Sequence, residues 1–315
     1  MKVTEHLSRA KGPLLSFEIV PPPRGKSVKD IIEIVEDLLP LNPSWIDVTA
    51  HASHADLLEQ NDGSFQRCIS RKRPGTIGIC GVIQNRFKID TVAHILCLGF
   101  TKEETEDALI ELQYLGVENV LALRGDYPNF EKRVSSNRSI NNYAADLVEQ
   151  LSDLRKGQYM QELESSHPMD FCVGVAGYPE KHIEAPNLIT DLKYLKEKVD
   201  KGAHYIVSQM FFETKHFVNF REECMQNGIN VPILPGLKLI HTPTQLKRIP
   251  KTFNVDLPEE LTKEILTNPK HTLEIGQRHC LKQCQELLEN GAPVLHFYVM
   301  NDAKQVVKVI KQLGL

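Results

Sequence analysis

Eight short apolar runs divide this chain, and helical patterns separate most of them. The runs cover residues 14–20, 45–50, 91–98, 119–123, 171–178, 205–212, 232–240 and 294–300. Continuous apolar runs are typical of parallel strands covered on both faces, and strands that alternate with helices predict an α/β fold. Because (β/α)8 TIM barrels span about 200 to 400 residues, the 315 residues are predicted to form one TIM-barrel domain, 1–315.

Helical periodicity fills most of the intervals between these runs. We expect helices over 27–39, 101–115, 143–154, 188–199, 217–226, 243–249, 258–266, 272–289 and 303–313. Residues 53–91 are less regular, and there we expect a helix near 56–71 and an edge strand or loop around 77–84. Residues 127–140 are predicted to be a polar loop, and residues 157–168 a surface insertion.

The main competing architecture is a doubly wound nucleotide-binding fold. That fold requires a glycine-rich turn directly after an early strand. Neither GxGxxG nor GxxxxGK followed by Ser or Thr occurs in the sequence. Any dinucleotide must therefore be held by barrel loops.

Composition and charge argue against several classes of protein. The 37 basic and 41 acidic residues give a net charge of -4, so no basic excess is available to bind nucleic acid. No apolar run approaches the roughly 20 residues that span a membrane, and the first residues lack the apolar core of a secretory signal. We therefore expect a cytoplasmic protein without a membrane partner. The seven cysteines are scattered and odd in number, which fits reduced thiols.

A metal site is the alternative interpretation of one helix. His279, Cys280 and Cys284 include positions four apart, which share a helix face. No second cluster of ligands completes a tetrahedral site, so no metal is predicted.

The fourth apolar run ends abruptly at Arg124, Gly125 and Asp126. In barrels and sheets of parallel strands, ligands bind at the carboxyl ends, and a glycine lets a ligand approach the backbone closely. The segment therefore indicates a cofactor site, although a surface turn with an ordinary ion pair has the same pattern.

Polar residues inside the apolar runs are the other candidates, above all Glu18, His94 and Gln209. Glu18 has no obvious cation beside it, so it either faces solvent or is held in a pocket for a purpose. A lone strand histidine such as His94 is more often a satisfied core residue than a ligand contact.

Nine motifs occur in order from about residue 14 to the C-terminus. They are SFExxPP at 16–22, DVTxH at 47–51, ALRGD at 122–126, NYAADLV at 142–148, VAGYPExHxEA at 175–185, DLKxLKEKVDxGA at 191–203, QMFFE at 209–213, PGL at 235–237 and LHFYxxN at 295–301. Together these motifs resemble the methylenetetrahydrofolate reductase family.

The resemblance implies a TIM-barrel flavoenzyme with noncovalent FAD. NADH or NADPH would reduce the flavin, which would pass a hydride to 5,10-methylenetetrahydrofolate and give 5-methyltetrahydrofolate. It also implies small-molecule partners and the homo-oligomer of bacterial relatives, without the regulatory domain that eukaryotic relatives append. The choice between NADH and NADPH stays open, because no readable ribose motif exists outside the doubly wound folds.

The resemblance also implies roles for individual residues. Glu18 would protonate N10 of the folate, because burial in an apolar strand raises the pKa of a carboxyl group. Asp126 matches the family's aspartate near the flavin and the pterin, where its charge can tune hydride transfer. Gln209 matches the residue that contacts nicotinamide and pterin in turn, and Gln245 is a weaker match at the folate site.

The implied flavin contacts form a longer set. They are Thr49, His51, His94, Arg124, Gly125, Asp126, Tyr143, Tyr178, His182, Asp191 and Lys198. Within the set, Lys198 is the natural phosphate partner, and Arg124 is expected to meet either an FAD phosphate or a structural carboxylate.

Three residues depart from the family pattern. Ala50 stands where an aromatic residue is usual, Asp302 replaces a basic residue for which Lys304 could substitute, and Lys238 is unusual in its motif. Lys238 supports a first alternative, a barrel aldolase that uses a Schiff-base lysine. Ala50 and Asp302 support a second, a flavin-binding partner subunit with little turnover of its own.

Overall fold

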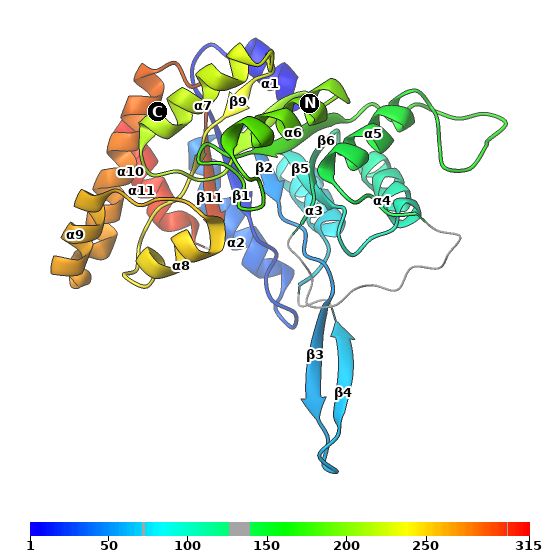
Figure 1. Ribbon diagram of the computed structural model, residues 1–315, viewed down its shortest axis with the longest axis horizontal. Helices are drawn as coiled ribbons and strands as arrows, with labels where there is room; N and C mark the ends of the chain where they lie inside the picture. The colour runs from blue at the N-terminus through cyan, green and yellow to red at the C-terminus, as the bar shows by residue number, and fades with distance from the viewer. Residues whose placement is uncertain (71–72, 126–138, 301) are drawn as a thin grey trace.

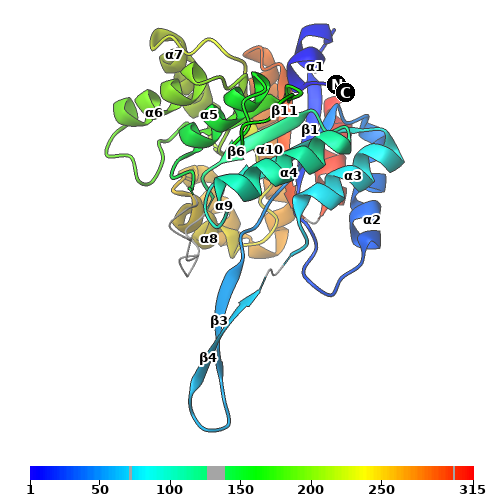
Figure 2. The same ribbon diagram turned by 90° about the vertical axis from the view of Figure 1, so that its right-hand side faces the viewer.

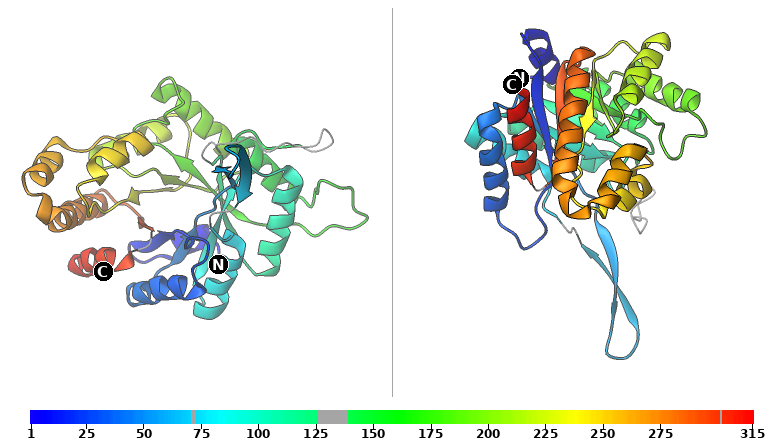
Figure 3. Two further views of the ribbon diagram at one scale, coloured as in Figure 1. Left: turned by 90° about the horizontal axis from the view of Figure 1, so that it is seen from below. Right: turned by 90° about the vertical axis from the view of Figure 1, so that its left-hand side faces the viewer.

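A parallel sheet forms the centre of the computed structural model, which describes residues 1–70, 73–125, 139–300 and 302–315. In order of pairing, its strands are β10 (Gly236–Leu237), β11 (Val294–Met300), β1 (Leu14–Ile19), β2 (Trp45–Val48), β5 (Asp90–Leu96), β6 (Asn119–Leu123), β7 (Cys172–Gly177), β8 (Tyr205–Ser208) and β9 (Ile233–Leu234). β9 and β10 are two halves of one strand interrupted at Pro235, and they pair with β8 and β11 respectively. The sheet thus closes on itself as an eight-stranded barrel, which confirms the predicted (β/α)8 fold (Figure 3).

Helices surround the barrel on its outside (Figures 1 and 3). They are α2 (Val28–Leu38), α3 (Thr76–Phe87), α4 (Lys102–Tyr114), α5 (Ala144–Arg155), α6 (Leu188–Asp200), α7 (Thr214–Gln226), α8 (Gln245–Phe253), α9 (Glu259–Thr267), α10 (Thr272–Glu289) and α11 (Ala303–Leu313). Local signals begin several of them. Thr101, for example, accepts a hydrogen bond from the backbone N of Glu104 (3.1 Å), whose carboxylate accepts one from the backbone of Thr101. Within the described ranges, no helix is both long and apolar enough to cross a membrane.

Side chains alternate along each barrel strand between the interior and the helices. On β2, Ile46 and Val48 pack in the core beneath the helices, whereas Trp45 packs inside the barrel. The interior cluster lies toward the amino ends of the strands and contains Val3, Trp45, Val92, Leu121, Cys172, Tyr205, Val207, Leu234 and Val294.

A short helix, α1 (Val3–Arg9), covers this end of the barrel and was absent from the sequence prediction. Val3 is fully buried in the interior cluster, and its backbone N donates to Oδ1 of Asn119 (2.8 Å). The carboxyl end of the barrel is therefore the end left for ligands.

The predicted helix near 56–71 is wrong. β3 (His54–Glu59) and β4 (Phe65–Ser70) form an antiparallel hairpin that projects away from the barrel (Figures 1 and 2). The Asp62 carboxylate accepts the backbone N–H two residues further on (2.9 Å), and Gly63 adopts a φ of 78°. An Asp-Gly pair is a hairpin turn signal, and the helical interpretation overlooked it.

The predicted edge strand or loop around 77–84 is also wrong, because α3 occupies this region. Gly81 lowers helix propensity, but Ile79 and Ile83 bury their side chains in the core. A Cβ added to Gly81 would lie 3.1 Å from the Leu115 side chain, so the glycine permits close packing. Tertiary packing therefore overrides the weak local signal.

We predict that Gly174→Ala destabilises the barrel. Gly174 on β7 is the register partner of Tyr205 on β8, and an added Cβ would lie 2.4 Å from the Tyr205 ring. Overpacking of this kind costs about 1 to 3 kcal/mol of unfolding free energy, which urea denaturation measures. Gly12→Ala is the control, because nothing lies within 4 Å of its added Cβ. Equal stability of the two variants would contradict the prediction.

Candidate active site

The carboxyl ends of the strands gather most of the predicted site residues. Glu18 lies near the end of β1 and His94 near the end of β5. The residues that follow strands are Thr49 and His51 after β2, Arg124 and Gly125 after β6, Tyr178 and His182 after β7, and Gln209 after β8. Because parallel strands of a barrel point the same way, these side chains meet at one mouth.

Glu18 is a largely buried carboxyl group, with only 13% of its side chain exposed. Its Oε2 lies 3.6 Å from Nε2 of His94. Burial raises the pKa of Glu18 to about 7; His94 opposes this shift, Asp47 adds to it and Lys238 opposes it. The sequence showed no obvious cation beside Glu18; in the structure, Lys238 directly after β10 influences its pKa through its charge.

A layer of buried polar side chains lies beneath the mouth, made of Ser16, Asp47, His94 and His296. Asp47 stands between two imidazoles, with Oδ1 3.6 Å from Nε2 of His94 and Oδ2 3.9 Å from Nδ1 of His296. His296 Nδ1 in turn lies 2.9 Å from the Ser16 hydroxyl. Burial raises the pKa of Asp47 to about 6, and it lowers the pKa of both histidines.

Asp47 and His296 were not among the predicted site residues, although a signal existed. On β2 the period of two puts Trp45, Asp47 and Thr49 on one face, and the bulky apolar residues between them on the other. The same alternation puts His296 on the face of Tyr298 in β11. A polar residue on the interior face of such a strand is therefore a candidate site residue in the same way as Glu18.

Arg124 and Gly125 directly follow β6 at the mouth. The Arg124 guanidinium forms an ion pair with Glu184, and its Cζ lies 5.1 Å from the centre of the Tyr143 ring. Gly125 adopts a φ of 88°, a conformation that favours glycine. Arg124 thus contacts a carboxylate here, and its phosphate contact stays a prediction. Asp126, the predicted aspartate near flavin and pterin, lies outside the described residues.

Tyr178, His182, Asp191 and Lys198 form a connected group between β7 and α6. The rings of Tyr178 and His182 meet edge to face at 4.6 Å, and the backbone N of His182 donates to Oδ2 of Asp191 (2.8 Å). The Lys198 amine donates to the carbonyl of Ala176. Burial lowers the pKa of Lys198 to about 8, against the opposing charge of Asp191. Its role as the phosphate partner stays a prediction.

The predicted substrate residues differ in their local contacts. Gln209 accepts the backbone N–H of the next residue at its Oε1 (2.9 Å). Gln245 begins α8, and its Oε1 accepts the backbone N of His241 (2.8 Å) and Thr242 (2.9 Å). Gln245 therefore holds the loop before α8, and contact with folate stays a prediction for both glutamines.

Two of the unusual residues also have structural partners. Asp302 caps α11 by accepting a hydrogen bond from the backbone N of Lys304 (3.2 Å). The Lys238 amine donates to the carbonyl of Tyr298 (2.8 Å). Burial lowers the pKa of Lys238 to about 8, and the charge of Glu18 is the largest opposing effect.

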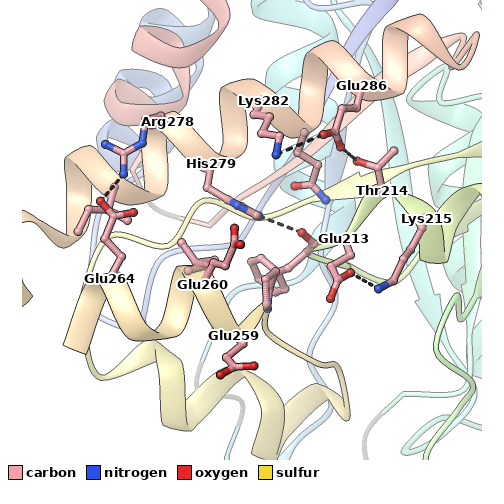
Figure 4. A pocket seen from close by; sticks show the side chains of 15 residues that line it. Glu213, Thr214, Lys215, Glu259, Glu260, Glu264, Arg278, His279, Lys282 and Glu286 are labelled. Atoms are coloured by element: carbon pink, nitrogen blue, oxygen red, sulfur yellow. Dashed lines mark hydrogen bonds and ion pairs between the residues drawn. The ribbon is translucent and has the colours of Figure 1, made fainter. Parts of the chain in front are cut away.

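A pocket of about 620 Å³ lies elsewhere, between α7, α9 and α10 (Figure 4). None of the predicted site residues lines it. Each lysine and arginine that lines it forms an ion pair with a glutamate, namely Lys215 with Glu213, Arg278 with Glu264, and Lys282 with Glu286. His279 Nε2 lies 2.9 Å from the carbonyl of Phe212, and in the described part of the chain no group of three or more His, Cys, Asp or Glu could hold a metal. The barrel mouth therefore remains the candidate site.

Several known proteins are similar to this chain. A probable methylenetetrahydrofolate reductase (NADPH) of Caenorhabditis elegans is 30% identical over 99% of this chain and 44% of the relative. A methylenetetrahydrofolate reductase (NADH) 1 of Arabidopsis thaliana is 32% identical over 95% of this chain and 48% of the relative. The 5,10-methylenetetrahydrofolate reductase of Salmonella typhimurium is 27% identical over 99% of this chain and 95% of the relative. The chain thus spans about half the length of the two eukaryotic relatives and nearly all of the bacterial one.

A solved structure supports the fold. It is described as an uncharacterized protein from Clostridium thermocellum that binds two copies of 5-methyl-5,6,7,8-tetrahydrofolic acid, and it aligns with a TM-score of 0.62 at 12% identity over 99% of this chain and 98% of that chain. The sequence model described as methylenetetrahydrofolate reductase matches residues 2–314, and the chain therefore belongs to this family.

Proposed function

We propose that this protein reduces 5,10-methylenetetrahydrofolate to 5-methyltetrahydrofolate with electrons from NADH or NADPH, carried by a noncovalent FAD. The observation that carries the proposal is Glu18, a buried carboxyl at the barrel mouth whose pKa is raised to about 7. Membership of the family supports the reaction class.

The residues at the mouth fit a flavin. Apart from Asp126, which is not described, the implied flavin contacts lie in or after the consecutive strands β2, β5, β6 and β7 or at the helices that follow them, so they form one continuous arc. Thr49 at the start of this arc has a buried hydroxyl oxygen without a hydrogen-bond partner in the described residues. A buried polar atom of this kind needs a partner, and a bound ligand supplies one. When bound, FAD supplies a carrier that accepts and passes on a hydride.

Glu18 would act at N10 of the folate. Opening the imidazolidine ring breaks the bond between N10 and the methylene carbon, and N10 takes up a proton as this bond breaks. The methylene carbon then receives the hydride, so NAD(P)H is oxidised and Glu18 loses one proton in each turnover. A carboxyl with a pKa of about 7 holds a proton near neutral pH and regains it from solvent afterwards.

Lys238 keeps the aldolase alternative open to a direct test. A buried lysine with a pKa of about 8 has the lowered basicity that Schiff-base chemistry uses. Such an enzyme would purify without flavin absorbance and would be trapped by borohydride in the presence of its substrate. The partner-subunit alternative predicts bound flavin without folate turnover by the purified chain.

An absorbance spectrum tests the main proposal directly. We expect the purified protein to show flavin absorbance that is lost on anaerobic addition of NADH or NADPH and returns on addition of methylenetetrahydrofolate. The donor that bleaches the flavin faster identifies the preferred nicotinamide. Protein that binds no added FAD would contradict the proposal.

We predict that Glu18→Gln separates the two half-reactions. Hydride transfer from NAD(P)H needs no acid at N10, so flavin bleaching should stay within about tenfold of wild type. Flavin reoxidation by methylenetetrahydrofolate should fall by about 10² to 10⁴, the usual range for a lost general acid. Anaerobic stopped-flow absorbance measures each half. Equal losses in both halves would instead mean that Glu18 positions the flavin.

We also predict that Glu18→Gln changes how stability depends on pH. From pH 4.5, the usual pKa, to about 7, the unfolded chain releases the Glu18 proton while the folded protein keeps it. Wild-type stability from this group therefore falls as pH rises through this window and levels off above it. The glutamine of the variant cannot ionise. The unfolding free energy of the variant minus that of wild type should therefore increase by up to about 3 kcal/mol as pH rises through this window.

Urea denaturation from pH 5 to 8 measures this difference. Glu36→Gln on the exposed face of α2 is the matched control and should follow the wild-type profile. A constant difference between wild type and Glu18→Gln across this range would show that Glu18 ionises alike in the folded and unfolded chain.

A further inference from the structure

Asp47 and Glu18 lie side by side inside the barrel. They are direct register partners in the parallel pairing of β1 with β2, so their side chains project to the same face. The Asp47 side chain is only 1% exposed, and neither of its oxygens has a hydrogen-bond partner in the described part of the chain. Asp47 is thus too deep to touch a substrate that reaches Glu18.

Two neighbouring carboxyl groups in such a site cannot both ionise easily. Water is largely excluded, so the repulsion between two negative charges is weakly screened. One of the two groups therefore keeps its proton to a higher pH, and the pair titrates as a unit. The surrounding groups determine which of the two stays protonated.

Asp47 has two imidazoles beside it. His94 from β5 and His296 from β11 face its two oxygens, at 3.6 and 3.9 Å, and His296 lowers the pKa of Asp47. Trp45 also lowers the pKa of Asp47, through a contact that falls short of hydrogen-bond geometry. Ser16 on β1 lies 2.9 Å from His296 Nδ1 and so fixes that ring.

Glu18 has fewer such neighbours. Of the described histidines, only His94 lies within ion-pair distance of Glu18, whereas Asp47 has both His94 and His296 beside it. Burial lowers the pKa of both histidines, so this difference lies in the number of neighbouring imidazoles. The other cation, Lys238, gives a hydrogen bond to the Tyr298 carbonyl, and its influence on Glu18 is smaller than those of His94 and Asp47.

Three other titratable groups within the described ranges interact electrostatically with this pair and stay uncharged at neutral pH. They are Tyr205 from β8, Tyr298 from β11 and Cys80 from α3, and burial raises the pKa of each above its ordinary value. None of them can take over the charge of either carboxyl group.

We propose that Asp47 is a positioning residue whose buried negative charge keeps the acidic proton on Glu18, at the mouth of the barrel. This inference rests on the proposed function for the use of that proton, but the location of the proton can be tested without any turnover. Asp47 acts through Glu18 and does not contact the substrate.

Isotope-edited infrared spectroscopy of the wild-type protein tests where the proton is. Near pH 7, we expect a protonated carboxyl band that shifts on ¹³C-glutamate labelling and is missing from Glu18→Gln. The same band should weaken in Asp47→Asn, because loss of the neighbouring charge lets Glu18 ionise at lower pH. A band that shifts with ¹³C-aspartate and disappears in Asp47→Asn would put the proton on Asp47 and overturn the proposal.

The pH profile of folate-driven flavin reoxidation tests the consequence. In Asp47→Asn we expect the alkaline limb to move to lower pH by at least about half a unit, which lowers the rate on that limb by about threefold. Bleaching by NAD(P)H should stay within about twofold of wild type. Asp47→Glu keeps a negative charge at this position, so its alkaline limb should lie at the same pH as in wild type.

Asp90→Asn is the matched control. Asp90 also lies beside a histidine, with Oδ2 2.8 Å from Nε2 of His6, but at the amino end of the barrel. Its substitution should leave the alkaline limb in place. An alkaline limb that stays in place or moves to higher pH in Asp47→Asn would overturn the proposal. Absence of folate turnover in the wild type would overturn the proposed function, and the infrared result alone would then decide the inference about Asp47.

Discussion

The burial of two carboxyl groups side by side in the barrel interior is the constraint on which the rest of the site depends. Interiors of TIM barrels are usually filled by layers of branched apolar side chains. Here the layer toward the amino ends is mainly apolar and includes Val3 and Val294. The layer above it contains Asp47, His94 and His296. Buried charge is costly unless it is compensated, so two imidazoles at 3.6 and 3.9 Å accompany the deeper carboxylate.

Two groups of side chains lie at the mouth above this polar layer. Toward β5, β6 and β7 lie side chains that already contact one another, such as Arg124 with Glu184 and His182 with Asp191. On the side of β1 and β10 lie Glu18 and Lys238, whose opposite charges influence each other's pKa. Contacts within the protein hold these side chains in fixed positions, so only ligands of matching shape and polarity can bind to them. Such an arrangement favours specific binding.

The candidate site does not coincide with the 620 Å³ pocket. The pocket between α7, α9 and α10 has about 620 Å³ of space, and each of its lysine and arginine side chains is paired with a glutamate. At the barrel mouth, buried atoms such as the Thr49 hydroxyl and His94 Nε2 have no hydrogen-bond partner in the described residues, and Gln283 Oε1 in the pocket is likewise without one. The mouth is the better candidate because its unsatisfied polar atoms lie at the carboxyl ends of the strands, where barrels bind ligands.

The sequence by itself determined the barrel and most of its elements, because apolar runs, helix caps and turn residues act over a few neighbouring positions. It also singled out Glu18, since a carboxylate in an apolar strand is unusual wherever the strand ends up. It did not determine α1 or α3, where burial against distant segments outweighed the local pattern, whereas the β3–β4 hairpin had a local signal in its Asp-Gly turn that the helical interpretation overlooked. Only the tertiary structure decided which groups surround Glu18 and Asp47. Ser16 and His296 are 280 positions apart, and they come within 2.9 Å only because the last strand of the barrel pairs with the first.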